Sequence, residues 1–295
     1  RNKYTQNEGQ NISFRNFRRD PLYVGIQTGN RPGGHIDLRF SNAFSLRAIY
    51  LAEDGGQAVG FGSGGIVGGS TQVAGELGIK PSPSIDIGLG YSYVNVSGSD
   101  TNFIFGNAGS DVTGGDGRLA YNPDLVSNIS HSIFHGRLDW DIFPAFAIFG
   151  RYSFDTASLY GYSGGTPVGG SLDANTWMAG LALPDFLGKG NLLEAAYLQP
   201  INITNNGVVS TRVEQDAEGN NVRVQNEVFN PNISSTNLGV VYPRRSATES
   251  NIAVSYRFRV TDRLTVTPEV LFVLGANNIN QNGITIGNLR ATFEF

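Results

Sequence analysis

The chain has 295 residues, of which 16% are charged, and it carries a formal net charge of −4, no cysteine and one methionine. The missing cysteines exclude a disulfide framework and thiolate zinc sites, and the small net charge provides no basic field of the kind that binds nucleic acid. No run approaches the ~18 consecutive apolar residues that a membrane-spanning helix needs, whereas a β-barrel fits this composition because its strands are apolar on one side only.

Apolar and polar residues alternate with a period of two along most of the chain, which indicates β-strands with one apolar face. In 35–40 the apolar set is Ile36, Leu38 and Phe40. Further runs of this kind lie at 71–80, 85–93, 134–141, 146–155, 251–260 and 284–295. Many reach the ~9–11 residues that a tilted strand needs to cross a bilayer, so their length favours a membrane barrel over a soluble sandwich, which also alternates.

The connections between these runs are predicted to alternate in length. Short turns are expected at 41–43, 81–84, 142–144, 184–190 and 261–263. Long, Gly- and Asn-rich loops are expected between them, near 54–70, 97–130, 158–173, 201–249 and 275–283. Short turns at one end and long loops at the other are typical of outer-membrane barrels, in which the turns face the periplasm.

We therefore predict an all-β fold, an antiparallel transmembrane β-barrel of about 14 strands that occupies residues 1–295. About eleven strands follow from His35 onward, 12–18 and 22–29 add two, and a strand before Gln10 makes the count even. The 208–229 segment is predicted to form a hairpin around Glu218-Gly219, which we interpret as an external ribbon. If this hairpin joined the wall instead, the count would be 16.

The 284–295 run is expected to be the closing strand of the barrel. Leu289, Ala291, Phe293 and Phe295 share one face, which we expect to meet lipid or a neighbouring subunit. The opposite face would point into the channel and carries Asn288, Arg290, Thr292 and Glu294. A terminal aromatic with this alternation resembles the signal by which barrel-assembly machinery recognises its clients.

Several ordered segments resemble the cyanobacterial major outer-membrane porins, distant relatives of the carbohydrate-selective OprB-type porins. They are "NAFSLRAIYLAEDGG" at 42–56, "PSIDIGLGYSYVN" at 83–95, "ALPDFLGKGNLL" at 182–193 and the last 32 residues from "LTVTPEV" to "ATFEF". The resemblance implies a homotrimeric porin in the outer membrane of a Gram-negative-type bacterium, passing small hydrophilic solutes and inorganic ions, with iron the usual suggestion. Members also carry an N-terminal S-layer-homology domain and coiled coil that bind the cell wall, so this chain is expected to be the barrel portion only.

The polar side of each strand supplies the candidate pore-lining residues, since the selectivity of a porin comes from its bore and its lumen charges. The basic candidates are Arg39, Arg47, Arg137, Arg151, Arg257, Arg259 and Arg290. The acidic candidates are Asp37, Glu76, Asp86, Asp139, Asp155, Glu194 and Glu269. We expect Arg257, Arg259 and Arg290 to form a positive wall with some preference for anions. The alternative is that the arginines pair with carboxylates and fill the interior.

The 97–130 loop is the candidate constriction, because of its length and the apolar "FIF" at 103–105 that could anchor it to the inner wall. Its charged residues are Asp100, Asp111, Asp116 and Arg118. The alternative is an external loop that packs against a neighbouring subunit. Aromatics near the strand ends fit interfacial girdles, namely Tyr91, Tyr93, Trp140, Phe143, Tyr152, Trp177, Phe293 and Phe295.

The sequence carries no convincing catalytic, cofactor or metal motif. The Gly-rich stretch at 60–69 lacks the Lys-Ser/Thr of a phosphate-binding loop. A hydrolase site of Ser132, His135 and Asp139 is disfavoured because strand spacing places Ser132 on the opposite face from the other two. We thus predict a porin rather than an enzyme, and the alternatives are an outer-membrane adhesin or barrel enzyme with a plugged lumen and a soluble all-β sandwich.

Overall fold

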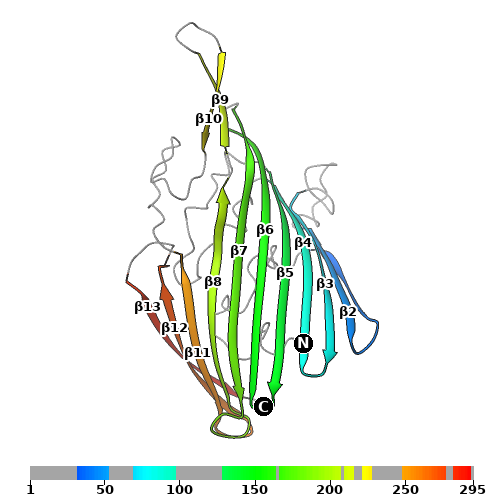
Figure 1. Cartoon of the computed structure of the whole chain (residues 1–295), viewed down its shortest axis with the longest axis vertical. Helices are drawn as coiled ribbons and strands as arrows, with labels where there is room; N and C mark the ends of the chain where they lie inside the picture. The colour runs from blue at the N-terminus through cyan, green and yellow to red at the C-terminus, as the bar shows by residue number, and fades with distance from the viewer. Residues whose placement is uncertain are drawn as a thin grey trace.

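The computed structural model describes residues 32–52, 69–97, 128–163, 166–206, 209–215, 221–227, 248–276 and 282–293. The secondary-structure elements in these ranges are β-strands that stand side by side along the long axis of the molecule (Figure 1). None of the described residues belongs to a helix long and apolar enough to cross a membrane.

The strands are longer than average, up to 19 residues. Their bounds are β1 Gly33–Arg39, β2 Phe44–Ala52, β3 Thr71–Ser82, β4 Ile85–Ser97, β5 Asn128–Phe143, β6 Phe146–Ser163, β7 Thr166–Pro184, β8 Leu192–Asn206, β9 Val209–Gln215, β10 Asn221–Glu227, β11 Ser250–Arg259, β12 Leu264–Leu274 and β13 Ile284–Phe293. The predicted all-β class is confirmed for these ranges.

Each strand of the wall pairs antiparallel with its neighbour in chain order, along the path β1 to β8 and then β11 to β13. The eleven strands of this path form one sheet, and no pairing joins β13 to β1 among the described residues. Residues 1–31 lie outside the described ranges and hold the predicted N-terminal strands, so the total of 14 stays a prediction.

Strands β9 and β10 leave this path and form the predicted ribbon. They pair with each other from Val209↔Glu227 to Gln215↔Asn221, and β9 pairs with the wall through Ser210 and Val209, which lie opposite Val168 and Gly169 of β7. In Figure 1 the ribbon projects from the end of the sheet opposite the short turns. The hairpin is therefore confirmed, and it adds no strands to the wall.

The short turns lie within two residues of the positions that the sequence predicts. The β1–β2 turn closes with Phe40 N–H donating to Phe44 O at 3.1 Å, while Ser41 Oγ accepts from the backbone N–H of Ala43 and Phe44. Thr261 Oγ1 does the same for Arg263 and Leu264 in the β11–β12 turn. Hydroxyls that satisfy turn amides in this way explain why Ser and Thr stand at these positions.

The predicted long loop at 158–173 is wrong. Strands β6 and β7 continue through it, and their ladder runs from Ala147↔Ala182 to Ser163↔Thr166. The Gly residues here have weak strand propensity, but each added pair satisfies two backbone groups, which stabilises the ladder once the strands are aligned. The 54–68 and 98–127 parts of the other predicted loops lie outside the described residues.

The two faces of the sheet are opposite in polarity to those of a soluble protein. Residues that pair across strands share a face, so the register assigns each side chain to one of the two. The exposed face carries Leu89, Phe134 and Tyr152 at 53%, 59% and 49% exposure. The buried face carries Glu76, Arg137 and Asp139 at 7%, 5% and 4%.

The apolar band on the exposed face has a limited height. On β5 it runs over nine residues from Ile142 to Phe134, and on β6 over nine from Phe146 to Phe154, before Ser132 and Thr156 follow. Nine residues rise about 30 Å along a strand, and a tilt of ~40° reduces this to about 23 Å. That is close to the ~25 Å apolar band of outer-membrane barrels.

Candidate functional site

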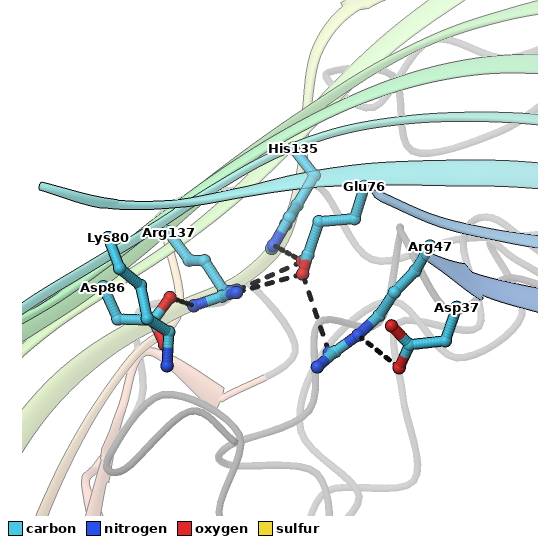
Figure 2. A network of polar contacts seen from close by, with 7 residues as sticks. All are labelled: Asp37, Arg47, Glu76, Lys80, Asp86, His135 and Arg137. Carbon is cyan, nitrogen blue, oxygen red and sulfur yellow. Dashed lines mark hydrogen bonds and ion pairs between the residues drawn. The ribbon is translucent and has the colours of Figure 1, made fainter. Parts of the chain in front are cut away.

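The buried face of β1 to β5 holds a network of charged side chains that Figure 2 shows together. We call it the Arg137 network, and its members are Asp37, Arg47, Glu76, Lys80, Asp86, His135 and Arg137. All of them except His135 and Lys80 are among the predicted acidic or basic lining residues. Register brings them together from five consecutive strands.

Arg137 is the centre of this network. Its Nε and Nη2 donate to the two carboxylate oxygens of Glu76 at 3.1 and 3.0 Å, and its Nη1 donates to Asp86 Oδ1 at 2.9 Å. The Arg137 side chain is 3% exposed. A bidentate pair of this kind is among the stronger polar contacts in proteins, and both partners depend on it because an unpaired buried charge is costly.

The ends of the network are more open. Arg47 lies 3.5 Å from Asp37 and 3.9 Å from Glu76, with its side chain 44% exposed, and Lys80 Nζ lies 2.9 Å from Asp86. Contacts at this exposure contribute little stability each. With His135 neutral, three carboxylates face three cations, so the network as a whole carries no net charge.

Two histidines on the buried face of β5 contact acidic or hydroxyl groups. His131 Nδ1 lies 2.6 Å from Asp155 Oδ2, and His135 Nδ1 lies 2.9 Å from Ser153 Oγ. Ser132 is on the exposed face, where it accepts from Tyr91 Oη at 3.3 Å. The register thus separates Ser132 from His135 and Asp139, as predicted, and Ser153 is fully buried and closed to a substrate.

A second charged cluster lies on the buried face of β8, β11, β12 and β13. Ser255 pairs in register with Glu194 on one side and Glu269 on the other. One step toward the short turns, Arg257 lies opposite Leu192, and Arg290 lies opposite Thr267. Acidic and basic side chains therefore alternate here between adjacent rows.

The predicted positive wall keeps two of its three arginines in this cluster. Arg259 ends β11, and its Nη2 lies 2.9 Å from Asp262 Oδ1 in the short turn, with both side chains open to solvent. Alternation correctly assigns Arg259 to the same face as Arg257, but Arg259 lies beside the turn, at the rim of the sheet.

The remaining predicted residues are scattered. Arg151 is buried between Arg137 on β5 and Met178 on β7, whereas Asp139 lies between Asp86 and Phe149. Arg39 is exposed at the end of β1. The candidate constriction residues Asp100, Asp111, Asp116 and Arg118 lie outside the described residues.

An apolar strip on the same face runs across β6, β7, β8, β11 and β12, alongside the second charged cluster, and the sequence analysis missed it. Its members are Ala147, Phe149, Met178, Ala182, Leu192, Ala196, Leu198, Ala253, Leu271, Val273 and Ala276, with Ile286 packed against them. The detectable signal was a run apolar on both faces, as in 177–183, where alternation fails. Phe149 lies flat on Gly180, where an added Cβ would come within 2.3 Å of the ring.

The aromatics predicted to form girdles lie on the exposed side of the sheet, apart from Phe295, which lies outside the described residues. Tyr91 and Phe134 have ring centroids 5.1 Å apart, and Trp177 stacks on Tyr197 at 4.9 Å. Trp177 Nε1 also donates to Gln199 Oε1 at 3.0 Å, where the apolar band gives way to polar residues. An aromatic ring with a satisfied polar tip at such a boundary is typical of a membrane interface.

Residues 220–295 match the family model of the carbohydrate-selective porin, OprB family. This is less than half of the chain. No curated protein matches the chain significantly.

Two solved structures with similarity to this chain are distant in sequence. Pseudomonas putida OprB at high pH is 15% identical with a TM-score of 0.47, over 88% of this chain and 57% of that chain. A variant ferric enterobactin receptor from Pseudomonas aeruginosa, in complex with enterobactin, is 11% identical with a TM-score of 0.43, over 86% of this chain and 38% of that chain. The chain thus spans less than two thirds of either protein, and TM-scores below 0.5 support no inference about it.

Proposed function

We propose that this chain forms a water-filled channel in an outer membrane, through which small hydrophilic solutes diffuse passively. One observation carries the proposal, namely the inverted polarity of the sheet. Large apolar side chains cover the exposed face in a band about nine residues high, and charged side chains occupy the buried face. Such a wall matches lipid outside and a polar interior, which is the arrangement of membrane barrels.

The solute class is proposed from the family match. The model that matches residues 220–295 describes carbohydrate-selective porins, so sugars are the first solutes to test. Inorganic ions, including iron, come second, because the resemblance to cyanobacterial porins suggests them. The same resemblance supports a homotrimer that contacts outer-membrane lipid in a Gram-negative-type, cyanobacterium-like cell, with the cell wall bound only through an N-terminal domain outside this chain.

The chemistry of such a channel would be non-covalent. Selectivity would come from the charges of the two clusters on the wall and from the 97–130 loop folding inward. The balanced Arg137 network favours the reading in which arginines pair with carboxylates over β1 to β5. The Arg257 and Arg290 pair is the better candidate for a local positive field.

Reconstitution tests this proposal directly. Purified protein in planar bilayers should give discrete conductance steps, and proteoliposomes should swell in isotonic solutions of small sugars at rates that fall with solute size. Swelling in stachyose, a tetrasaccharide, serves as the internal size control. Protein that inserts into bilayers without conductance and without solute-dependent swelling contradicts the proposal.

A plugged barrel acting as an adhesin or enzyme is the second candidate, and the burial of the polar wall favours it. Arg137, Asp139 and Arg151 are each at most 5% exposed, as expected where a plug covers the wall. The two candidates differ in dye release. A porin releases a small trapped dye from proteoliposomes, and a plugged barrel retains it.

A further inference from the structure

Arg137 reaches its partners by crossing a neighbouring strand. It belongs to β5, whereas Glu76 belongs to β3, and β4 lies between them. Two strand spacings of about 4.8 Å separate the backbones, and a side chain must lie flat on the middle strand to bridge them. Figure 2 shows the guanidinium extended along the wall in this way.

The middle strand has no side chains at the crossing point. Gly88 pairs directly with Arg137, and Gly90 pairs with both His135 on β5 and Glu76 on β3. We call Gly88 and Gly90 the glycine gap. His135 uses the same gap, since its Nε2 lies 4.0 Å from Glu76 Oε2.

The fit of Arg137 over Gly88 is tight. An ideal Cβ at Gly88 would lie 2.4 Å from Arg137 Nε and 2.8 Å from both its Cγ and its Cζ. Real Cβ atoms do not approach other heavy atoms so closely, so any side chain here must displace the guanidinium. By contrast, a Cβ at Gly136, next to Arg137 in sequence and on the other face, would meet only Leu89 Cδ2 at 3.9 Å.

We propose that the glycine gap determines the ion selectivity of the channel by holding Arg137 flat against the wall. In that position Glu76 and Asp86 neutralise the guanidinium, and it adds no positive charge near the pore axis. A side chain at position 88 would lift the guanidinium away from both carboxylates and into the lumen. The inference rests on the proposed porin function, and Gly88 acts as a positioning residue through Arg137.

The test compares three variants in planar bilayers under a salt gradient. Gly88→Ala should shift the reversal potential toward the equilibrium potential of the anion and raise the anion-to-cation permeability ratio about twofold. This is the effect expected of one unit charge that is brought within ~8 Å of the ion path and partly screened by salt. Arg137→Gln should shift the reversal potential toward cations, because Glu76 and Asp86 lose their partner. Gly136→Ala, the matched control, should leave it unchanged.

The opposite signs of the first two shifts are the decisive readout. If Gly88→Ala only disrupted the network, it would move the potential as Arg137→Gln does, or not at all. Either result overturns the proposal. In the Gly88→Ala/Arg137→Gln double variant the anion shift should disappear, because the charge that the gap restrains is gone.

A measurement on the unaltered protein covers the case in which Gly88→Ala fails to fold. Phenylglyoxal modifies accessible guanidinium groups, and mass spectrometry locates the modified residues. Arg47, with its side chain 44% exposed, should react, and Arg137 should stay protected. Equal reaction at both sites overturns the proposal. Because this assay needs no conductance, it separates failure of the glycine gap from failure of the porin function.

Discussion

Replacing Leu89 by arginine tests whether the exposed face meets lipid. Leu89 is the central residue of the apolar row on β4, which runs from Ile85 to Tyr93, and 53% of its surface is open. Arginine at the midplane of a bilayer destabilises a barrel by about 2–4 kcal/mol. The folded-to-unfolded ratio of Leu89→Arg should therefore fall by at least about 30-fold.

A control at the edge of the band makes this prediction specific. Ser158 is an exposed residue on β6, four positions beyond Phe154, where the apolar band ends. Four residues rise about 13 Å along the strand, so Ser158→Arg should lie at the interface and cost only about 0–1 kcal/mol. Leu89→Val keeps the site apolar and controls for the change of side-chain shape.

The assay is reversible unfolding by guanidinium chloride in lipid vesicles, followed by tryptophan fluorescence. The chain has two tryptophans, Trp140 and Trp177, and both lie in the wall. In a water-exposed sheet, Leu89→Arg would change stability by no more than about 0.5 kcal/mol, as for other surface substitutions. Equal unfolding midpoints for Leu89→Arg and Ser158→Arg would therefore refute a lipid-facing band.

Three further predictions concern the buried face. Gly180→Ala should lower the free energy of unfolding by about 1–3 kcal/mol through overpacking, since the added Cβ would lie 2.3 Å from Phe149 and 2.8 Å from the Ala195 carbonyl oxygen. A Cβ added at Gly287 would have no atom within 4 Å, so Gly287→Ala should leave the unfolding midpoint unchanged. Glu76→Gln should lower the free energy of unfolding by about 3–5 kcal/mol, because it breaks the buried ion pair with Arg137. Asp262→Asn removes one partner of an exposed ion pair and should cause no measurable loss of stability in the same denaturation assay. Reversing the charge of Arg257 or Arg290 to Glu should move the reversal potential toward the value of a cation-selective channel. Arg259→Glu should move it less, because that side chain lies in solvent at the rim of the sheet, where salt screens it. An unmoved potential in the first two variants contradicts a positive wall.

The strand pattern could be predicted from the sequence because alternation reports directly which face a residue takes. The runs at 71–80 and 85–93 lie within β3 and β4, and the run at 251–260 lies in β11 except for its last residue. The short turns could also be predicted, because the hydroxyls of Ser41 and Thr261 accept hydrogen bonds from backbone amides within the same turn. The full length of β6 and β7 could not be predicted from local sequence, because each strand is stabilised by its pairing with the other rather than by the strand propensity of its own residues.

The site was harder to predict. Alternation assigns a side chain to one face of the sheet, but it gives neither the height of that side chain along the wall nor the residue that it contacts. Glu76 and Arg137 are 61 positions apart, and their contact depends on the register of two strand pairs and on Gly88 between them. Arg259 shows the limit for depth, since it shares the parity of Arg257 and lies at the rim. The apolar strip around Phe149 and Met178 was missed because alternation assigns only polar residues to this face.

Burial explains why charges on this wall occur in compensated sets. Taking an ion out of water costs several kcal/mol unless close partners of opposite sign replace the water. Arg137, at 3% side-chain exposure, has two carboxylates, and the rows of Glu194 and Glu269 alternate with those of Arg257 and Arg290. The sum of the charges on such a wall says little about ion preference. What an ion meets depends on how far each charged group stands from the wall, and small residues such as Gly88 set that distance.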